Sequence, residues 1–391
     1  MNNPNNKSKI AIVVVGYNRL ASIKRLLQSL LDAKYPNKDI PLVISIDCSG
    51  DEQLYKYVKD FRWPYGDRYI RIQETRLGLK KHIIECGNLT KYFKAIILLE
   101  DDLFVSPYFY DYIEQTVEKY GDDERIAEIS LYKNERNGYV GLPFDNMKDG
   151  SDVFLMQDVG TWGECWTEQM WNGFSKWYNE ECSEEIILAT NMPSTIKTWT
   201  KAWSKYYNAY VVSKNKYILY PNIAVCTNFN DAGEHVNNST SDVQVSLLMN
   251  TFPYKLPDFE SLIKYDVFFN NENIYDWIGL KQDELCIDLY GFQYSYNNKD
   301  YLLSTKILSC PIRKSFGIKL RPIELNVKYD IKGTGIFLYD IHNKQDVEKG
   351  HYPFEVISYF LKGFNIILLL QKVWAHKCIL VKYYIRKILR K

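Results

Sequence analysis

The sequence lacks the cysteine patterns that mark disulfide frameworks and structural zinc sites. Its eight cysteines are widely scattered, contain no Cys-x-x-Cys pair and form no cluster with the five histidines at zinc-binding spacing. We therefore expect mostly buried, reduced thiols and a reducing compartment. The first residues, MNNPNNKSK, are polar and lack the apolar core of a secretory signal, so we expect a cytoplasmic protein.

Long apolar runs and an excess of charge are also missing. The most apolar stretch near the end, FNIILLLQKVWA, is interrupted by Asn365, Gln371 and Lys372 and is shorter than the roughly 20 residues of a bilayer span. The formal net charge of +1 gives no argument for nucleic-acid binding. Aromatic residues, by contrast, make up 15% of the chain, and because Tyr and Trp rings stack on sugars and bases, they hint at a carbohydrate or nucleotide ligand.

The first 120 residues alternate strand patterns with amphipathic helix patterns. Continuous apolar runs predict strands, and apolar residues three and four apart predict the helices between them. The predicted strands span 10–16, 41–47, 68–74 and 94–100. Four such units predict a mostly parallel, doubly wound α/β sheet, in which ligands bind outside the carboxyl ends of the strands. We expect Asp47 and the carboxylates at 100–102 to line one crevice there.

The stretch AIILLEDDLFVSP ends an apolar strand in three consecutive carboxylates, Glu100, Asp101 and Asp102. Carboxylates repel a phosphate-bearing ligand unless a divalent cation lies between them, and hard oxygen ligands suit Mg²⁺ or Mn²⁺. The alternative is a solvated acidic turn or a cap for the following helix, a role that Ser106 could fill. The position at the end of the fourth predicted strand favours the cation site.

Three segments together resemble a known enzyme class. VVVGYNRLASIKRLLQSLL, SIDCSGD and IILLEDDLFVSPYFYDYI follow one another as the corresponding segments do in GT-A glycosyltransferases. The pattern is most similar to the group that contains eukaryotic protein N-acetylglucosaminyltransferase I and to family 2-like bacterial enzymes of surface-polysaccharide synthesis. The resemblance covers roughly residues 9–245, and EDDL with its flanks is its most specific motif. It implies a GT-A fold for the predicted sheet.

The resemblance also implies roles for individual residues. It places the nucleotide base and ribose next to Tyr17, Asn18 and Arg19, and it implies that Asp47 accepts a hydrogen bond from uracil. Asp102 would ligate the metal, while Glu100 and Asp101 would bind sugar and ribose hydroxyls. Gly78, Lys80 and His82 are candidates for contact beneath the diphosphate. His235, in the loop of residues 221–238, is a candidate to close over the diphosphate and a possible metal ligand. A solvated helix face is the alternative for Lys80.

The acceptor side is less well defined. The segment GTWGECWTEQMW resembles the acceptor loop of the bacterial members, so Trp162 and Gly163 are candidates for acceptor contact. Inverting transfer needs a general base for the acceptor hydroxyl, and the eukaryotic relatives use an Asp in a Trp-Asp helix start. The matching region here, IKTWTKAWSKYY, has no carboxylate. We take Glu164 as the first candidate for the base and Asp158 as the second.

The resemblance and the patterns divide the chain into three predicted parts. These are a catalytic domain over 1–250, a mixed α+β accessory segment over 251–350 and a basic amphipathic helical tail over 351–391. Residues 371–391 contain seven Lys or Arg and no acid, and Trp374 begins an apolar helical face continued by Cys378, Val381, Ile385 and Ile388. This pattern predicts peripheral contact with anionic lipid at the inner face of the cytoplasmic membrane. Docking on the protein or on a partner is the alternative.

Together these features predict a metal-dependent, inverting hexosyl- or N-acetylhexosaminyltransferase. Its donor would be a nucleotide-diphosphate sugar, expected to be a UDP-sugar, and its acceptor a saccharide or lipid-linked saccharide in polysaccharide or glycolipid assembly. One rival is a sugar nucleotidyltransferase, but GYNRLASI does not supply the Gly-rich phosphate loop that such an enzyme needs after its first strand. The other rival is a non-catalytic carbohydrate-binding protein of the same fold, which the missing Trp-Asp base keeps open.

Overall fold

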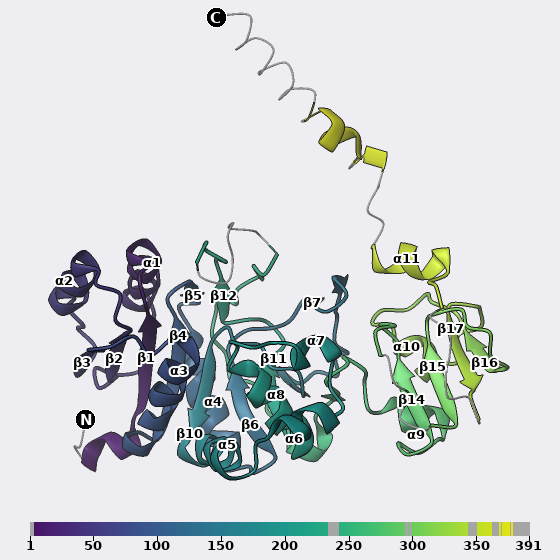
Figure 1. Cartoon of the computed structure of the whole chain (residues 1–391), viewed down its shortest axis with the longest axis horizontal. Helices are drawn as coiled ribbons and strands as arrows, with labels where there is room; N and C mark the ends of the chain where they lie inside the picture. The colour runs from purple at the N-terminus through teal and green to yellow at the C-terminus, as the bar shows by residue number, and fades with distance from the viewer. Residues whose placement is uncertain are drawn as a thin grey trace, which may run out of the picture.

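The chain is represented by a computed structural model whose described residues are 4–233, 242–293, 296, 299–342, 350–361, 367, 368, 370–375 and 377. Figure 1 shows its main parts, which are a large sheet with its helices and a smaller sheet toward one side. The helical tail residues 370–375 lie apart from both sheets. The large sheet has nine strands in the order β13-β9-β11-β6-β10-β4-β1-β2-β3.

The N-terminal half of the sheet has the predicted β-α alternation. The elements are β1 (Ile10–Gly16), α1 (Leu20–Leu31), β2 (Leu42–Ile46), α2 (Glu52–Asp60), β3 (Arg68–Ile72), α3 (Leu79–Gly87), β4 (Ala95–Glu100) and α4 (Phe109–Tyr120). Strands β3, β2, β1 and β4 are neighbours and all parallel. Every residue of β1 and β2 is buried, as continuous apolar runs require. The predicted α/β fold class is therefore confirmed.

Short 3₁₀ turns and a second, two-stranded ribbon accompany this half. The turns are η1 (Pro4–Ser8) and η2 (Asn88–Tyr92), and the ribbon pairs β5 (Leu103–Val105) with β12 (Cys226–Asn228) in antiparallel fashion. Because β5 starts directly after the acidic loop, this ribbon fixes the path of the chain that leaves the carboxylates.

The second half of the large sheet is mixed. Its strands are β6 (Ile126–Ser130), β9 (Val153–Met156), β10 (Glu164–Thr167), β11 (Tyr217–Pro221) and β13 (Lys264–Tyr265). Strand β10 lies between β4 and β6 and is antiparallel to both. Part of the predicted acceptor loop is thus a buried central strand. The helices that follow are α5 (Glu168–Glu180), α6 (Glu184–Ala189), α7 (Ser194–Lys197) and α8 (Ser204–Ser213).

The smaller sheet belongs to the predicted accessory segment. Its order is β14-β15-β17-β16, and the elements are β14 (Leu285–Asp288), β15 (Tyr301–Ser304), β16 (Ile312–Phe316) and β17 (Ile336–Asp340), with α9 (Ile274–Ile278), α10 (Leu325–Lys328) and α11 (Phe354–Phe360) beside them. A further hairpin pairs β7 (Arg136–Asn137) with β8 (Leu142–Pro143). The predicted domain boundary lies at residue 250. Strand β13, which follows this boundary in the sequence, pairs with β9 at the edge of the large sheet.

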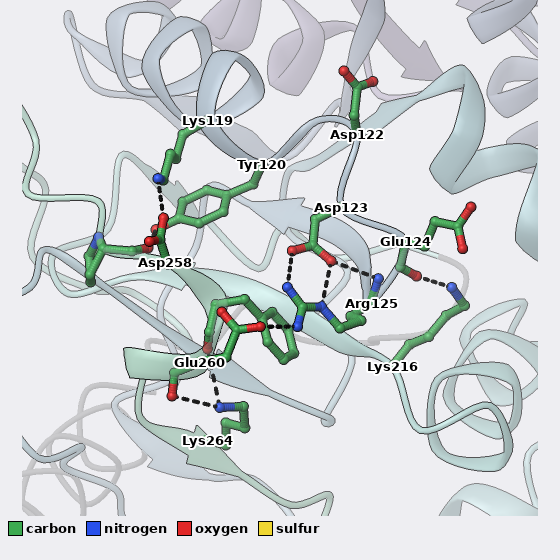
Figure 2. A network of polar contacts seen from close by, with 12 residues as sticks. Lys119, Tyr120, Asp122, Asp123, Glu124, Arg125, Lys216, Asp258, Glu260 and Lys264 are labelled. Carbon is green, nitrogen blue, oxygen red and sulfur yellow. Dashed lines mark hydrogen bonds and ion pairs between the residues drawn. The ribbon is translucent and has the colours of Figure 1, made fainter.

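The segment leading into β13 is tied to the large sheet by both charged and apolar groups. Figure 2 shows Lys119 paired with Asp258, and Arg125 paired with Asp123 and Glu260. Most of these groups are exposed, and exposed ion pairs add little to stability because solvent screens them. The buried Phe259 of η3 (Phe259–Ser261) and the β13–β9 pairing therefore supply most of the attachment.

The tail is described only in part. Residues 367, 368, 370–375 and 377 are helical, and Ile367, Leu370 and Trp374 are 70%, 61% and 70% exposed. Within the described ranges we find no helix with the length and hydrophobicity needed to cross a bilayer.

Candidate functional site

A cavity lies at the carboxyl ends of β1, β2 and β4, where the topology of a parallel sheet leads us to expect a ligand. It is lined by Val15, Gly16, Tyr17, Asn18, Arg19, Asp47, Arg76, Gly78, Leu79, His82, Glu100, Asp101, Asp102, Asn230, Asp231 and Gly233. The predicted nucleotide-binding residues lie together here, with the exception of Lys80. Arg76 and Asp231 belong to the same cavity but were not singled out from the sequence.

The acidic loop is held from the β5–β12 side. Asp102 accepts a hydrogen bond from Asn228 Nδ2 at 3.2 Å, and the Asp102 carbonyl accepts one from the Phe229 amide at 2.9 Å. Asn228 is the last residue of β12, so the ribbon carries its amide to the carboxylate. The position of Asp102 is thus set by a strand more than 120 residues away in the sequence.

Arg19 bridges the two aspartates of the loop. It precedes the first turn of α1, and its guanidinium donates to Asp101 and, over 3.0 Å, to Asp102 Oδ2. The same group donates to the Asp231 carbonyl at 3.2 Å. Arg19 is therefore the counter-charge of the two aspartates, and its contact with the nucleotide, which the resemblance implies, stays a prediction.

The cavity carries more negative than positive charge. Five carboxyl groups and two guanidinium groups are among its lining side chains. Burial, followed by the charges of Asp102 and Asp101, raises the pKa of Glu100 to about 8. Burial also raises the pKa of Asp101 to about 6, although Arg19 opposes this shift. Burial alone would lower the pKa of Arg19, but the two aspartates raise it above its usual value.

Asp47 fixes the loop that faces the acidic strand end. Its carboxylate accepts backbone hydrogen bonds from Cys48 and Leu77, both at 2.8 Å, and from Gly78 at 2.9 Å. The side chain is only 3% exposed. These bonds join the end of β2 to the start of α3, and the expected bond from a uracil ring to Asp47 stays a prediction.

The start of α3 brings three predicted residues to different places. Gly78 adopts a left-handed φ of +75°, which favours glycine, and lies at the cavity wall. His82 also lines the cavity, where its Nε2 lies 2.7 Å from Ser45 Oγ and burial lowers its pKa to about 4, so the imidazole is neutral. Lys80 is not part of the lining, and its ammonium lies 4.9 Å from the centre of the Tyr206 ring.

Tyr17 and Arg76 form a cation–π pair in the lining of the cavity, close to the carboxyl end of β1. The guanidinium carbon lies 4.7 Å from the centre of the Tyr17 ring. A ring and a guanidinium plane are the surfaces on which nucleobases stack. Arg76 could have been noticed in the sequence, since it opens the RLGLKK segment that supplied Gly78 and Lys80.

Glu164, the first candidate for the catalytic base, lies inside the sheet. Its side chain has no exposed surface, and neither carboxyl oxygen has a hydrogen-bond partner among the described residues. Burial, followed by the charges of Glu128 and Glu100, raises its pKa well above the usual range. A general base has to reach the acceptor hydroxyl. Because this carboxyl does not line the cavity, its catalytic role stays a prediction without support from the geometry.

Asp158, the second candidate, is also buried and already engaged. It accepts hydrogen bonds from Tyr139 and from Asn134 Nδ2 at 3.3 Å, and burial raises its pKa to about 6. It does not line the cavity. These two bonds give Asp158 a structural role, because they link the segment after β9 to the region of the β7–β8 hairpin.

The predicted acceptor residues lie near one another but outside the cavity wall. Trp162 is partly buried, and its ring centre lies 4.6 Å from that of Tyr132. Gly163 has a φ of +100°, and a Cβ there would lie 3.2 Å from Leu131, so both backbone and space favour glycine. His235, the second predicted metal ligand, lies outside the described residues.

Glu164 allows a stability test with a defined pH dependence. A carboxyl whose folded pKa is raised keeps its full contribution to stability below the unfolded pKa and loses it as the pH rises toward the folded pKa. We expect Glu164→Gln to raise the free energy of unfolding by about 1–3 kcal/mol near pH 8 and by less near pH 5. Urea unfolding at both pH values measures the change in stability. If the role of Glu164 is purely structural, the kcat of Glu164→Gln should fall by less than about tenfold.

Glu168→Gln, at an exposed carboxylate paired with Lys7, is the matched control and should change stability by less than about 1 kcal/mol at either pH. A destabilised Glu164→Gln with a kcat lowered by about 100-fold or more would instead support the base predicted from sequence.

The residues of the acidic loop fit a divalent cation of the kind that is shared with a substrate. Among the described residues no three His, Cys, Asp or Glu side chains form a metal cage by themselves. Mg²⁺ and similar ions, however, are held at phosphate-binding sites by one or two carboxylates together with substrate oxygens. Asp102 provides such a carboxylate, and the ion would offset the excess negative charge of the cavity.

Comparison with known proteins finds no matching family profile and no matching curated protein. Among solved structures the chain is similar to S. aureus TarS 1–349 in complex with UDP-GlcNAc, with 14% identity, a TM-score of 0.37, and coverage of 58% of this chain and 60% of that one. It is also similar to the mannosyltransferase PcManGT from Pyrobaculum calidifontis in complex with GDP-Man and Mn²⁺, at 13% identity, a TM-score of 0.31 and coverage of 43% and 47%.

A third similar structure is GalNAc-T7 with UDP, GalNAc and Mn²⁺, at 14% identity, a TM-score of 0.34 and coverage of 56% and 43%. The chain thus spans about three fifths of the TarS 1–349 chain. At these identities and TM-scores the functional argument rests on the cavity itself.

Proposed function

We propose that this chain is a glycosyltransferase that takes a sugar from a nucleotide-diphosphate sugar, with a UDP-sugar as the expected donor. The observation that carries the proposal is the cavity at the carboxyl ends of β1, β2 and β4, which Asp101, Asp102 and Arg19 line together with the Tyr17–Arg76 pair. The planar pair suits a nucleobase, and the acidic loop suits a diphosphate that arrives with a divalent cation.

The residues of the cavity divide the work of holding such a donor. Asp47 keeps the α3 loop in place, and neutral His82 adds a polar group without charge. Arg19 and Arg76 supply positive charge on two sides. A bound divalent cation would offset the charge that develops on the leaving diphosphate. Glu100 and Asp101 are left to accept hydrogen bonds from donor hydroxyls.

Inverting transfer to a saccharide or lipid-linked saccharide is the finer part of this proposal. It requires a carboxylate or another base on the acceptor side, across the sugar from the diphosphate. The specific observation that favours a second candidate, a non-catalytic carbohydrate-binding protein, is that both predicted bases, Glu164 and Asp158, are buried. Nucleotide binding without turnover would identify this second function.

Calorimetry with UDP, with and without Mn²⁺ or Mg²⁺, tests the donor site directly. The proposal predicts binding of UDP that strengthens at least about tenfold with the metal, because the ion offsets the carboxylates that otherwise repel the diphosphate. Folded protein that binds no UDP in the presence of either metal would refute the proposal.

We also propose that the tail attaches the enzyme to an anionic membrane surface. Ile367, Leu370 and Trp374 are exposed and spaced three and four residues apart, so they share one helical face. The sequence that follows continues this apolar spacing, and residues 371–391 carry seven basic side chains and no acid. Such a charge complements anionic phospholipids at the inner face of the cytoplasmic membrane, where a lipid-linked acceptor would be found.

Vesicle flotation tests this attachment. The full chain is expected to float with vesicles that contain phosphatidylglycerol and to stay behind with pure phosphatidylcholine. A double variant, Leu370→Glu with Trp374→Glu, should lose most of the floated fraction, since it places charge in the apolar face. Ile312→Glu, at another exposed apolar residue, is the control and should float normally. Equal flotation of the double variant, or binding to neutral vesicles alone, would contradict the proposal.

A further inference from the structure

We propose that Arg19 is an internal counter-cation that pairs with Asp101 and Asp102 and gives them up when a divalent cation and a nucleotide diphosphate bind together. The inference rests on the proposed function and adds a coupling between the two ligands of that site. It assigns Arg19 as a positioning residue, not as a group that reacts.

The contacts of Arg19 show that it occupies the place between the two carboxylates. Its two terminal nitrogens separate, so that one donates to Asp101 and the other to Asp102 at 3.0 Å. The Asp231 carbonyl accepts a third hydrogen bond at 3.2 Å. The Asp101 and Asp102 side chains are 5% and 15% exposed, and that of Arg19 is 23% exposed. All partners therefore meet in a partly dehydrated space, where charge interactions are stronger than in water.

The two neighbouring aspartates need a positive partner such as Arg19. Without Arg19, the neighbouring carboxylates of Asp101 and Asp102 would face each other, with Glu100 beside them, and no other positive group is bonded to Asp102 among the described residues. Asn228 is bonded to the other oxygen of Asp102 but carries no charge. Removing one partner of a largely buried pair leaves an uncompensated charge and is destabilising.

The same arrangement makes the guanidinium a competitor of a divalent cation. A metal ion that takes Asp102 Oδ2, alone or with an oxygen of Asp101, has to replace an Arg19 N–H. The displaced guanidinium then needs another acceptor. Arg19 lines the cavity, so the phosphate oxygens of a bound donor are within the same space, and a guanidinium binds phosphate in the same two-pronged way as carboxylate. Metal and nucleotide should therefore bind cooperatively, because each removes the cost of the other.

Mn²⁺ titrations followed by electron paramagnetic resonance, without nucleotide, test the competition. Arg19→Gln is expected to bind Mn²⁺ about 5- to 30-fold more tightly than the wild type, since the competing cation is gone. The factor by which saturating UDP strengthens Mn²⁺ binding should fall by a similar amount, because it includes the release of Arg19 in the wild type only. Arg19→Lys keeps the positive charge but loses the two-pronged guanidinium, so its Mn²⁺ affinity should lie between those of the wild type and Arg19→Gln.

Arg71→Gln is the charge-matched control. Arg71 lies in β3, pairs with Glu85 at 3.8 Å and does not line the cavity, so its removal changes the net charge equally without freeing Asp101 or Asp102. Its Mn²⁺ affinity should change by less than about twofold. Thermal unfolding of each variant confirms that it is folded, and a less severe Arg19→Lys substitution serves if Arg19→Gln does not fold.

Two outcomes separate this inference from the proposed function. If the wild type binds UDP with Mn²⁺ but Arg19→Gln binds Mn²⁺ no more tightly than the wild type, the counter-cation role of Arg19 is refuted and the donor site stands. If the wild type binds neither UDP nor Mn²⁺, the proposed function fails first.

Discussion

Replacing Asp102 by Asn is expected to weaken the binding of UDP in the presence of Mn²⁺ by about 100-fold or more. The substitution preserves the size of the side chain and its contact with Asn228, but it removes the charge that would hold the metal ion and that is paired with Arg19. Loss of a direct metal ligand has larger effects than loss of supporting groups, which already costs about 10–100-fold. Isothermal titration calorimetry of UDP at fixed Mn²⁺ measures the change.

Asp122→Asn provides the control for this substitution. Asp122 precedes β6 and does not line the cavity, so its removal should leave UDP affinity unchanged within about twofold. Unaltered UDP binding in a folded Asp102→Asn variant would show that the acidic loop does not hold the metal, and the division of roles among the three carboxylates would have to be abandoned.

Asp47→Ala is expected to have the largest effect on stability, lowering the free energy of unfolding by about 2–4 kcal/mol. The substitution leaves the amides of Cys48, Leu77 and Gly78 without their acceptor in a place from which solvent is largely excluded. Because the same bonds hold the start of α3 at the cavity, UDP affinity should fall as well. Urea unfolding monitored by tryptophan fluorescence measures the stability.

Asp51→Ala, at the N-cap of α2, is the comparison for this change. Asp51 accepts backbone bonds from Gln53 and Leu54 at 3.0 Å each but is partly exposed, so its loss should cost only about 1 kcal/mol. Equal stabilities of the Asp47→Ala and Asp51→Ala variants would mean that the Asp47 bonds contribute no more than an ordinary helix cap.

The predictable part of the fold is the part whose signals are local. The apolar runs of β1, β2 and β4 and the spacing of Leu26, Leu27 and Leu30 in α1 each lie within a few residues of one another, and parallel strands order themselves by general rules. The carboxyl ends of those strands then had to meet, which is why Asp47 and Asp102 could be placed in one cavity from sequence.

The rest depends on contacts between distant residues. Strand β10 begins at Glu164 and enters the sheet between β4 and β6, yet the segment around it, residues 160–171, has the glycines and tryptophans of a loop. Asp231 reaches the cavity through Ser22 and Arg25, more than 200 residues away. Residues 194–213, whose sequence favours one continuous helix, instead contain the separate helices α7 and α8. Burial of Glu164 and Asp158 likewise follows from the assembled sheet and not from their neighbours in sequence.

A screen for hydrolysis or transfer across UDP-, GDP-, dTDP- and CMP-activated sugars, with Mn²⁺ and with Mg²⁺, tests the central claim most directly. The account predicts metal-dependent release of a nucleoside diphosphate from at least one UDP-sugar, and loss of this release in Asp102→Asn. Release of the nucleoside diphosphate at the same rate by Asp102→Asn and by the wild type would contradict the assigned site. Folded protein that binds UDP but releases no nucleotide from any donor, with any saccharide or lipid-linked acceptor added, would contradict the assignment as an enzyme.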